Sequence, residues 1–152
     1  MITLKEKKSS VIINEIGLHI NELILDGIEI LKPSKDGHQT HGGCAFLLPY
    51  ANRIKNGFYK FNSENYELQK NVEGNSIHGF GKELLWEVKM KNKHIVDGMC
   101  SIIGHGYPFN LKANIRLELD SSTFRVRLYF KNEGKIQLPL SPGAHPYFLF
   151  SE

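Results

Sequence analysis

Cysteines are scarce in this 152-residue sequence, and long apolar runs are absent. The two cysteines, Cys44 and Cys100, cannot build the multi-bridge framework that stabilises small secreted domains. Both have apolar neighbours, which predicts buried free thiols in a reducing compartment. No apolar run is long enough to span a membrane, and residues 1–8 lack the apolar core of a signal peptide. We therefore expect a cytoplasmic protein that does not enter a membrane.

No long stretch of the chain carries charge of only one sign. Lysine and arginine total 19 and aspartate and glutamate 16, which gives a formal net charge of +3 with the two signs interspersed. Only residues 5–8 and 89–93 are locally basic, and no glycine-aromatic RNA-binding signature occurs. This pattern does not favour a nucleic-acid partner.

Common signatures of nucleophilic and cofactor chemistry are also missing. No serine lies in a nucleophile elbow, no glycine-rich phosphate loop opens a helix, and no carboxylate pair is evident. His38, His41 and Cys44 have the three-residue spacing of metal ligands on one helix face. However, Gly42-Gly43 disfavours a helix there, and no Cys-x-x-Cys pair is present. We expect a solvated loop followed by a buried thiol, with no metal and no cofactor.

Short apolar segments separated by turn residues make up most of the chain, which has 14 glycines and 6 prolines. Asp26-Gly27 lies between apolar runs, which is a hairpin signal, and residues 84–91 alternate as a strand does. No segment has a convincing helical pattern. A chain of this length buries about 68–70% of its unfolded surface, enough for one core. The pattern predicts an all-β antiparallel sandwich that occupies residues 1–152 as one domain.

The clearest strand pair lies at residues 111–119 and 124–130, where apolar and polar residues alternate. Pairing Leu119 with Phe124 places all the apolar side chains on one face of the hairpin. The same register sets Glu118 opposite Arg125, an attractive cross-strand pair. We therefore expect an antiparallel hairpin with one face exposed to water.

Residues 141–148 combine a histidine with prolines and aromatic residues. The residue before a proline is restricted to extended backbone, so Pro146 should hold His145 in a straight segment. A turn at Pro142-Gly143 is expected just ahead of it. A stiffly held imidazole followed by aromatic residues suits a ligand site, so His145 is the first candidate.

Arg53 and His78 are further candidates at loops or strand ends, and Asn52 and Tyr147 are neighbours of Arg53 and His145. Arg53, beside an apolar run, is either half of a structural ion pair or a planar fork that binds hydroxyl or carboxylate oxygens. His78 either packs structurally against aromatic residues or belongs to the site. From the residues alone, acid–base chemistry by histidine and the binding of a neutral polar ligand both remain open.

Several motifs in order resemble the aldose 1-epimerase, or galactose mutarotase, family. They are Leu-Pro-Tyr-Ala-Asn-Arg-Ile at 48–54, Gly-Phe at 57–58, Tyr-Glu-Leu at 66–68, Asn-Ser-Ile-His-Gly at 75–79, Trp86, Gly-Tyr-Pro-Phe at 106–109 and His-Pro-Tyr-Phe at 145–148. The resemblance implies a β-supersandwich that holds a sugar in an open cleft and interconverts its α and β anomers without a cofactor. A small-molecule sugar is therefore the expected ligand.

The resemblance also implies roles for individual residues. His145 resembles the general acid that protonates the ring oxygen, while a glutamate removes the proton of the anomeric hydroxyl. His78 and Arg53 resemble groups that bind sugar oxygens. Asn52 and Tyr147 are substrate-binding candidates through their places beside Arg53 and His145.

The chain departs from the family in one respect, because it resembles only the N-terminal half. The family's catalytic glutamate and a further sugar-binding acid lie well downstream of His-Pro-Tyr-Phe, and Glu152 does not match that motif. Three interpretations follow: an enzyme subunit whose C-terminal half is a separate chain or is absent from this sequence, a carbohydrate-binding module, or a self-associating scaffold. A half sandwich exposes sheet edges that invite pairing, so we expect a homo-oligomer or a partner chain.

Overall fold

Strands make up nearly all regular structure in residues 1–150, the part of the chain that this computed structural model describes. The strands are β1 (Ile2–Glu6), β2 (Ser9–Ile13), β3 (Ile20–Leu25), β4 (Ile28–Glu29), β5 (Cys44–Leu47), β6 (Arg53–Ile54), β7 (Phe58–Phe61), β8 (Glu64–Glu67), β9 (Ser76–Ile77), β10 (Glu87–Asn92), β11 (Ile95–Gly104), β12 (Tyr107–Leu119), β13 (Phe124–Asn132) and β14 (Gly143–Pro146). Two short 3-10 helices, η1 (Lys55–Gly57) and η2 (Gly81–Glu83), complete the list. The all-β prediction is confirmed. Within residues 1–150, no helix has the length and apolar character needed to cross a membrane.

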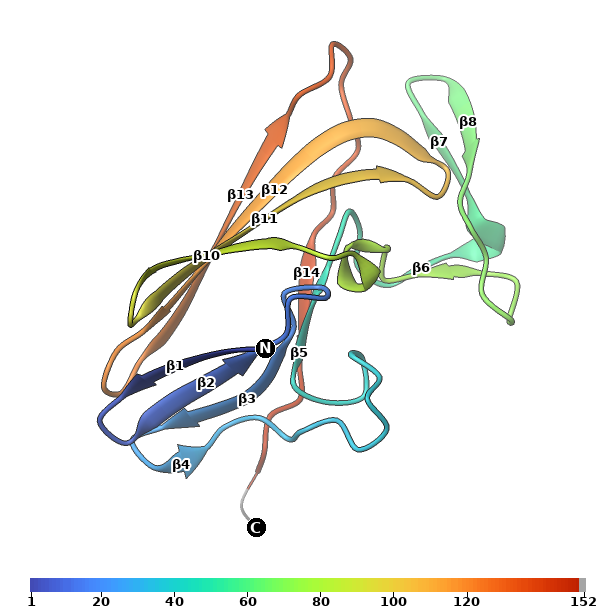
Figure 1. The fold of residues 1–152 in the computed structure, drawn as a ribbon. Coiled ribbons are helices and arrows are strands. Elements are labelled where there is room, and N and C mark those ends of the chain that lie inside the picture. Colours follow the sequence, from blue (N-terminus) through green and yellow to red (C-terminus); the bar gives the residue numbers. More distant parts are fainter. Residues whose placement is uncertain (151–152) are drawn as a thin grey trace.

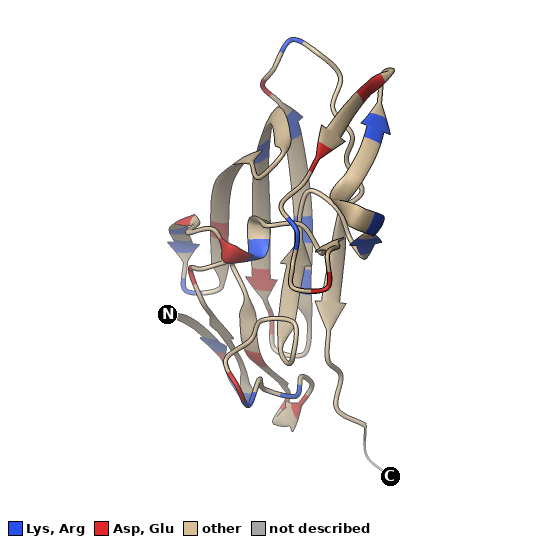
Figure 2. Cartoon of the chain, turned by 90° about the vertical axis from the view of Figure 1, so that its right-hand side faces the viewer, with Lys and Arg blue, Asp and Glu red and all other residues tan. Residues whose placement is uncertain are grey.

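Two antiparallel sheets form the body of the fold (Figure 1). One has the order β1-β2-β3-β5-β14 with β4 beside β3, and the other the order β10-β11-β12-β13. A single core cluster joins them, with Leu4 and Val11 from the first sheet and Leu111 and Ile115 from the second. β6–β9 and β7–β8 are small two-stranded sheets. Basic and acidic positions are interspersed along the ribbon in Figure 2, as they are in the sequence.

The β12–β13 hairpin has the predicted register. Leu119 lies opposite Phe124, and Glu118 lies opposite Arg125. Alternate residues of β12 are buried, so its apolar face packs on the core. The carboxylate of Glu118 forms ion pairs with Arg125, at 3.6 Å, and with Arg127. The prediction of one buried and one wet face is confirmed for β12.

The strand predicted over residues 84–91 begins later, at Glu87. The backbone N–H of Trp86 donates to the carbonyl of Glu15 at 3.0 Å, and the carbonyl of Leu84 accepts from the N–H of Gly17 at 2.7 Å. This distant pairing occupies the backbone of residues 84–86, so β10 starts only after it. Trp86 is buried, but Met90 is 51% exposed, so the predicted common face is only partly buried.

The backbone around His145 is extended, as predicted from Pro146. β14 pairs with β5, and His145 lies opposite Ala45. The prediction of a turn at Pro142-Gly143 is wrong, because Gly143 is already part of β14 and pairs with Leu47. Pairing with β5 therefore determines this backbone more than the local turn preference does.

The two cysteines are free, and they differ in burial. Cys44 is buried, and desolvation raises the pKa of its thiol to about 11. Cys100 is only partly buried, so the prediction of a buried thiol is correct for Cys44 alone. In the loop before Cys44, the ring of His41 contacts Asp36, with Nδ1 and Oδ2 2.6 Å apart. That contact lowers the pKa of the Asp36 carboxyl.

Candidate functional site

Two histidines that are far apart in sequence face each other across the end of β5. His78 follows β9, which pairs with β6 so that Arg53 lies opposite Ile77. His145 lies on β14, and its ring meets that of His78 edge to face, with centroids 5.3 Å apart and planes at 75°. The structure thus brings together His78 and His145, with Arg53 on the strand paired to the one that precedes His78.

Asn52 and His78 are joined by two reciprocal hydrogen bonds. The N–H of His78 donates to the carbonyl of Asn52 at 2.9 Å, and the N–H of Asn52 donates to Nδ1 of His78 at 3.0 Å. Both residues have left-handed backbone, with φ of 64° and 62°, a conformation that asparagine and histidine adopt more readily than most residues. The side-chain oxygen of Asn52 accepts the N–H of Arg53 at 2.9 Å. Asn52 therefore shapes the backbone of the site.

Arg53 lies at the edge of the site in an exposed ion pair. Its guanidinium is 3.2 Å from the carboxylate of Glu73, and the two side chains are 49% and 57% exposed. Exposed pairs of this kind contribute only about 0–1 kcal/mol to stability. Glu73 is thus the partner that a structural ion pair of Arg53 requires. The pair is weak enough for the guanidinium to leave Glu73 and bind an oxygen of a ligand.

Tyr147 supports His145 from its other side. The two rings stack with centroids 5.0 Å apart and planes at 28°. The hydroxyl of Tyr147 donates to the carbonyl of Thr40, which fixes the ring against the loop before β5. Nδ1 of His145 is buried without a hydrogen-bond partner among the described residues, which leaves Nε2 as the nitrogen available to a ligand.

Burial and nearby charges both favour the neutral form of His78. Partial burial is the main cause of a lowered pKa, and the nearby His145, Lys82 and Arg53 lower it further. A lowered pKa favours the uncharged imidazole, which can act as a hydrogen-bonding group.

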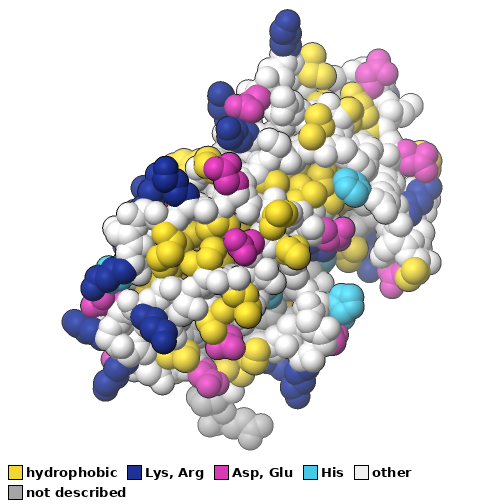
Figure 3. Space-filling view, in the orientation of Figure 1, with side chains coloured by type: hydrophobic (Ala, Val, Ile, Leu, Met, Phe, Trp, Pro, Cys, Tyr) yellow, Lys and Arg dark blue, Asp and Glu magenta, His cyan; other side chains and the backbone are white. Residues whose placement is uncertain are grey.

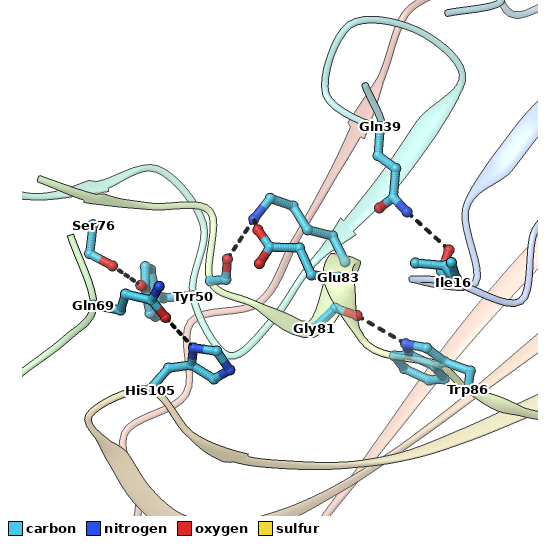
Figure 4. Close-up of polar contacts among 11 residues, drawn as sticks. Ile16, Gln39, Tyr50, Gln69, Ser76, Gly81, Glu83, Trp86 and His105 are labelled. Atoms are coloured by element: carbon cyan, nitrogen blue, oxygen red, sulfur yellow. Dashed lines mark hydrogen bonds and ion pairs between the residues drawn. The ribbon is translucent and has the colours of Figure 1, made fainter. Parts of the chain in front are cut away.

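A second set of polar residues, missed in the sequence, lies around a neighbouring cavity of about 550 Å³ (Figure 4). Tyr50 and Ser76 share a hydrogen bond of 2.6 Å, and His105 contacts Gln69 while stacking on Phe80. The cavity is lined by the residues before and after His78 in the chain, so it adjoins the histidine pair. Tyr50 and Ser76 belong to motifs noted above, but nothing in the local sequence signals a role for Gln69, Phe80 or His105.

The two sheets form a galactose mutarotase-like fold. The structure superposes on the crystal structure of a candidate aldose 1-epimerase from Escherichia coli K12 with a TM-score of 0.85 and 26% identity, over 98% of this chain and 52% of that one. The sequence model of the aldose 1-epimerase family matches residues 1–152, so the chain belongs to that family.

Two curated relatives show how much of the family this chain represents. It is 31% identical to the uncharacterised protein YphB of Escherichia coli over 130 residues. This aligned region covers 83% of this chain and 44% of YphB. It is 32% identical to the galactose mutarotase of Pongo abelii over 103 residues. This aligned region covers 64% of this chain and 29% of that mutarotase. The chain thus spans less than half the length of the curated relatives it matches, which confirms the resemblance to an N-terminal portion.

Proposed function

We propose that Arg53, His78 and His145 bind an aldose, a hexose or a related sugar, in the interconversion of its α and β anomers. The observation that supports this most directly is the edge-to-face pair of His78 and His145, with centroids 5.3 Å apart. Donors placed close together can bind adjacent oxygens of one sugar ring. Membership of the aldose 1-epimerase family gives these donors a substrate class.

In the proposed reaction, His145 donates a proton to the ring oxygen while a base removes the proton of the anomeric hydroxyl. The bond between the anomeric carbon and the ring oxygen breaks and leaves an open-chain aldehyde. Rotation about the bond to the neighbouring carbon, followed by reclosure with the proton transfers reversed, gives the other anomer. This scheme needs an acid and a base with pKa values near the working pH, and no cofactor.

The base is proposed to come from the remaining part of the family fold, which residues 1–152 do not include. Glu73, the carboxylate that contacts the candidate residues, is engaged by Arg53. Glu152 lies outside the described residues. Within residues 1–150, β13 and β14 each end a sheet with one unpaired edge, and exposed edges of this kind accept further strands. A second copy of this chain is the other occupant to be tested.

A carbohydrate-binding module is the second candidate function. The observation in its favour is that Arg53, His78 and His145 supply hydrogen-bond donors, while the carboxylate beside them is ion-paired. Such a site would hold a sugar without opening its ring.

Optical rotation of freshly dissolved α-D-glucose or α-D-galactose distinguishes the two functions. Formate replaces the missing carboxylate base, and the chain is compared with His145→Ala at equal formate concentration. We expect the chain to accelerate anomer exchange beyond formate alone, and His145→Ala to lose that acceleration. Equal rates for the two proteins would contradict the enzyme proposal, and saturable binding without acceleration would support the module.

A further inference from the structure

The hydrogen bond between Asn52 and His78 defines where His78 carries its proton. A backbone N–H is always a donor, so Nδ1 of His78, 3.0 Å from the nitrogen of Asn52, must be the acceptor. In a neutral imidazole one nitrogen accepts and the other carries the proton. The proton of neutral His78 therefore lies on Nε2.

We infer that Asn52 is a positioning residue that locks His78 as the neutral Nε2–H tautomer, so that His78 donates a hydrogen bond to an oxygen of the ligand. The identity of that ligand as a sugar rests on the proposed function, but the tautomer does not. The inference separates the roles of the two histidines. His78 is a fixed donor, and His145 is the group free to exchange a proton.

The Asn52 N–H, partial burial and nearby positive charge all oppose protonation of His78. A proton on Nδ1 would face the N–H of Asn52, so that two donors would meet and their hydrogen bond would be lost. Arg53 from β6, Lys82 from η2 and His145 from β14 add positive charge around the ring. The acidic groups at these positions are already engaged, because Glu73 pairs with Arg53 and Glu83 pairs with Lys82.

The left-handed backbone of Asn52 is what aims its N–H at the ring. Asparagine adopts this conformation more readily than most residues, and here its side-chain oxygen also accepts the N–H of Arg53. Alanine has neither property, whereas glycine keeps the freedom to adopt positive φ. Asn52→Gly should therefore retain the lock, and Asn52→Ala should weaken it.

His145 has no comparable lock. Its Nδ1 is buried without a hydrogen-bond partner among the described residues, and its ring is held by stacking on Tyr147. Stacking fixes the plane of the ring, but it does not select which nitrogen carries the proton. The structure thus fixes the tautomer of His78 and leaves that of His145 open.

Nitrogen-15 NMR of the imidazole rings tests this directly, without a sugar. We expect neutral His78 to show an unprotonated Nδ1 and a protonated Nε2 at pH values above the ordinary histidine pKa of about 6.5. Asn52→Gly should keep this pattern, while Asn52→Ala should show tautomer exchange and a higher pKa for His78. His19, whose Nε2 donates to the carbonyl of Gly42 at 3.0 Å, reports whether each variant is folded.

A matched control separates the lock from general backbone strain. Asn62 also has positive φ, at 49°, but lies in the β7–β8 turn, so Asn62→Ala should leave the His78 spectrum unchanged. A second variant, His78→Gln, keeps a donor near the position of Nε2 and should retain more sugar affinity than His78→Ala. A wild-type His78 with its proton on Nδ1, or an Asn52→Ala spectrum identical to wild type, would overturn the inference whether or not the chain binds a sugar.

Discussion

Gly79 determines how closely His78 can approach the end of β5. It has a φ of +60°, and a Cβ at this position would lie 2.0 Å from the carbonyl oxygen of Leu48. Real Cβ atoms do not come this close to backbone oxygens, so a side chain here would displace the segment that carries His78. The geometry of the histidine pair therefore depends on a residue that contributes no functional group.

Gly79→Ala is predicted to destabilise the chain more than Gly74→Ala does. Gly74 also has positive φ, at +76°, but a Cβ there would meet nothing within 4 Å, so its replacement adds backbone strain without a clash. We expect Gly74→Ala to lower the free energy of unfolding by about 1–2 kcal/mol. Gly79→Ala should lose at least about 1 kcal/mol more through steric overlap. Urea denaturation measures both, and equal losses would show that the close approach to Leu48 has no energetic consequence.

At the scale of single residues, the sequence motifs select candidate residues but do not predict their contacts. Family motifs indicate Arg53, His78 and His145, and the structure places the two histidines together. The contact of Asn52 with Nδ1 of His78 could not be predicted, because it depends on two left-handed residues brought together by the pairing of β6 with β9. The Glu73 partner of Arg53 comes from a long loop whose path no local pattern specifies.

Among the elements, the pair β11–β12 is held by the most buried ionic contact described. Asp97 lies opposite Arg116 across the two strands, and the guanidinium contacts its carboxylate through two hydrogen bonds of 2.7 and 2.8 Å. The side chain of Asp97 is only 8% exposed. The hydrogen bonds from Arg116 are the main cause of the lowered pKa of the Asp97 carboxyl. A lowered carboxyl pKa stabilises the fold above about pH 4, and this contribution is lost as the pH falls further.

Arg116→Ala is predicted to lower the free energy of unfolding at neutral pH more than Arg125→Ala does, because it leaves the Asp97 carboxylate, which is 8% exposed, without its main partner. Lys91, 3.6 Å from Asp97, compensates only in part. Arg125→Ala on the same sheet is the control, since that side chain is 56% exposed and its ion pair contributes about 0–1 kcal/mol. Thermal or urea unfolding measures both variants. Similar losses of unfolding free energy in the two variants would contradict the claim that burial of Asp97 strengthens its ion pair with Arg116.

Local patterns predict an element well where its partner is close in sequence. The β12–β13 register follows from alternation and from the Glu118–Arg125 pair, because both strands belong to one hairpin. The strand at residues 84–91 is mispredicted because residues 84–86 pair with residues 15–17. The turn expected at Pro142-Gly143 fails for a related reason, since β14 pairs with β5 from a distant part of the chain.

At the scale of the whole molecule, the end strands of the two main sheets are open to further pairing. β13 and β14 end their sheets, and the described residues of the C-terminal third include exposed apolar side chains. These are Ile103, Leu128, Tyr129, Ile136, Phe148, Leu149 and Phe150. Hydrophobic side chains also reach the surface between charged ones on the face shown in Figure 3. Since the curated relatives are more than twice as long as the part matched here, a further polypeptide could cover these edges.

Sugar binding at the histidine pair is the central claim, and a titration of D-galactose followed by NMR tests it most directly. We predict saturable shifts of the imidazole signals of His78 and His145. Arg53→Ala should weaken binding by about tenfold or more through loss of a charge-assisted hydrogen bond, while Arg125→Ala, an arginine in a similarly exposed ion pair, should not. Absence of saturable shifts, shifts confined to Gln69 and His105 of the neighbouring cavity, or equal affinity in Arg53→Ala would contradict it.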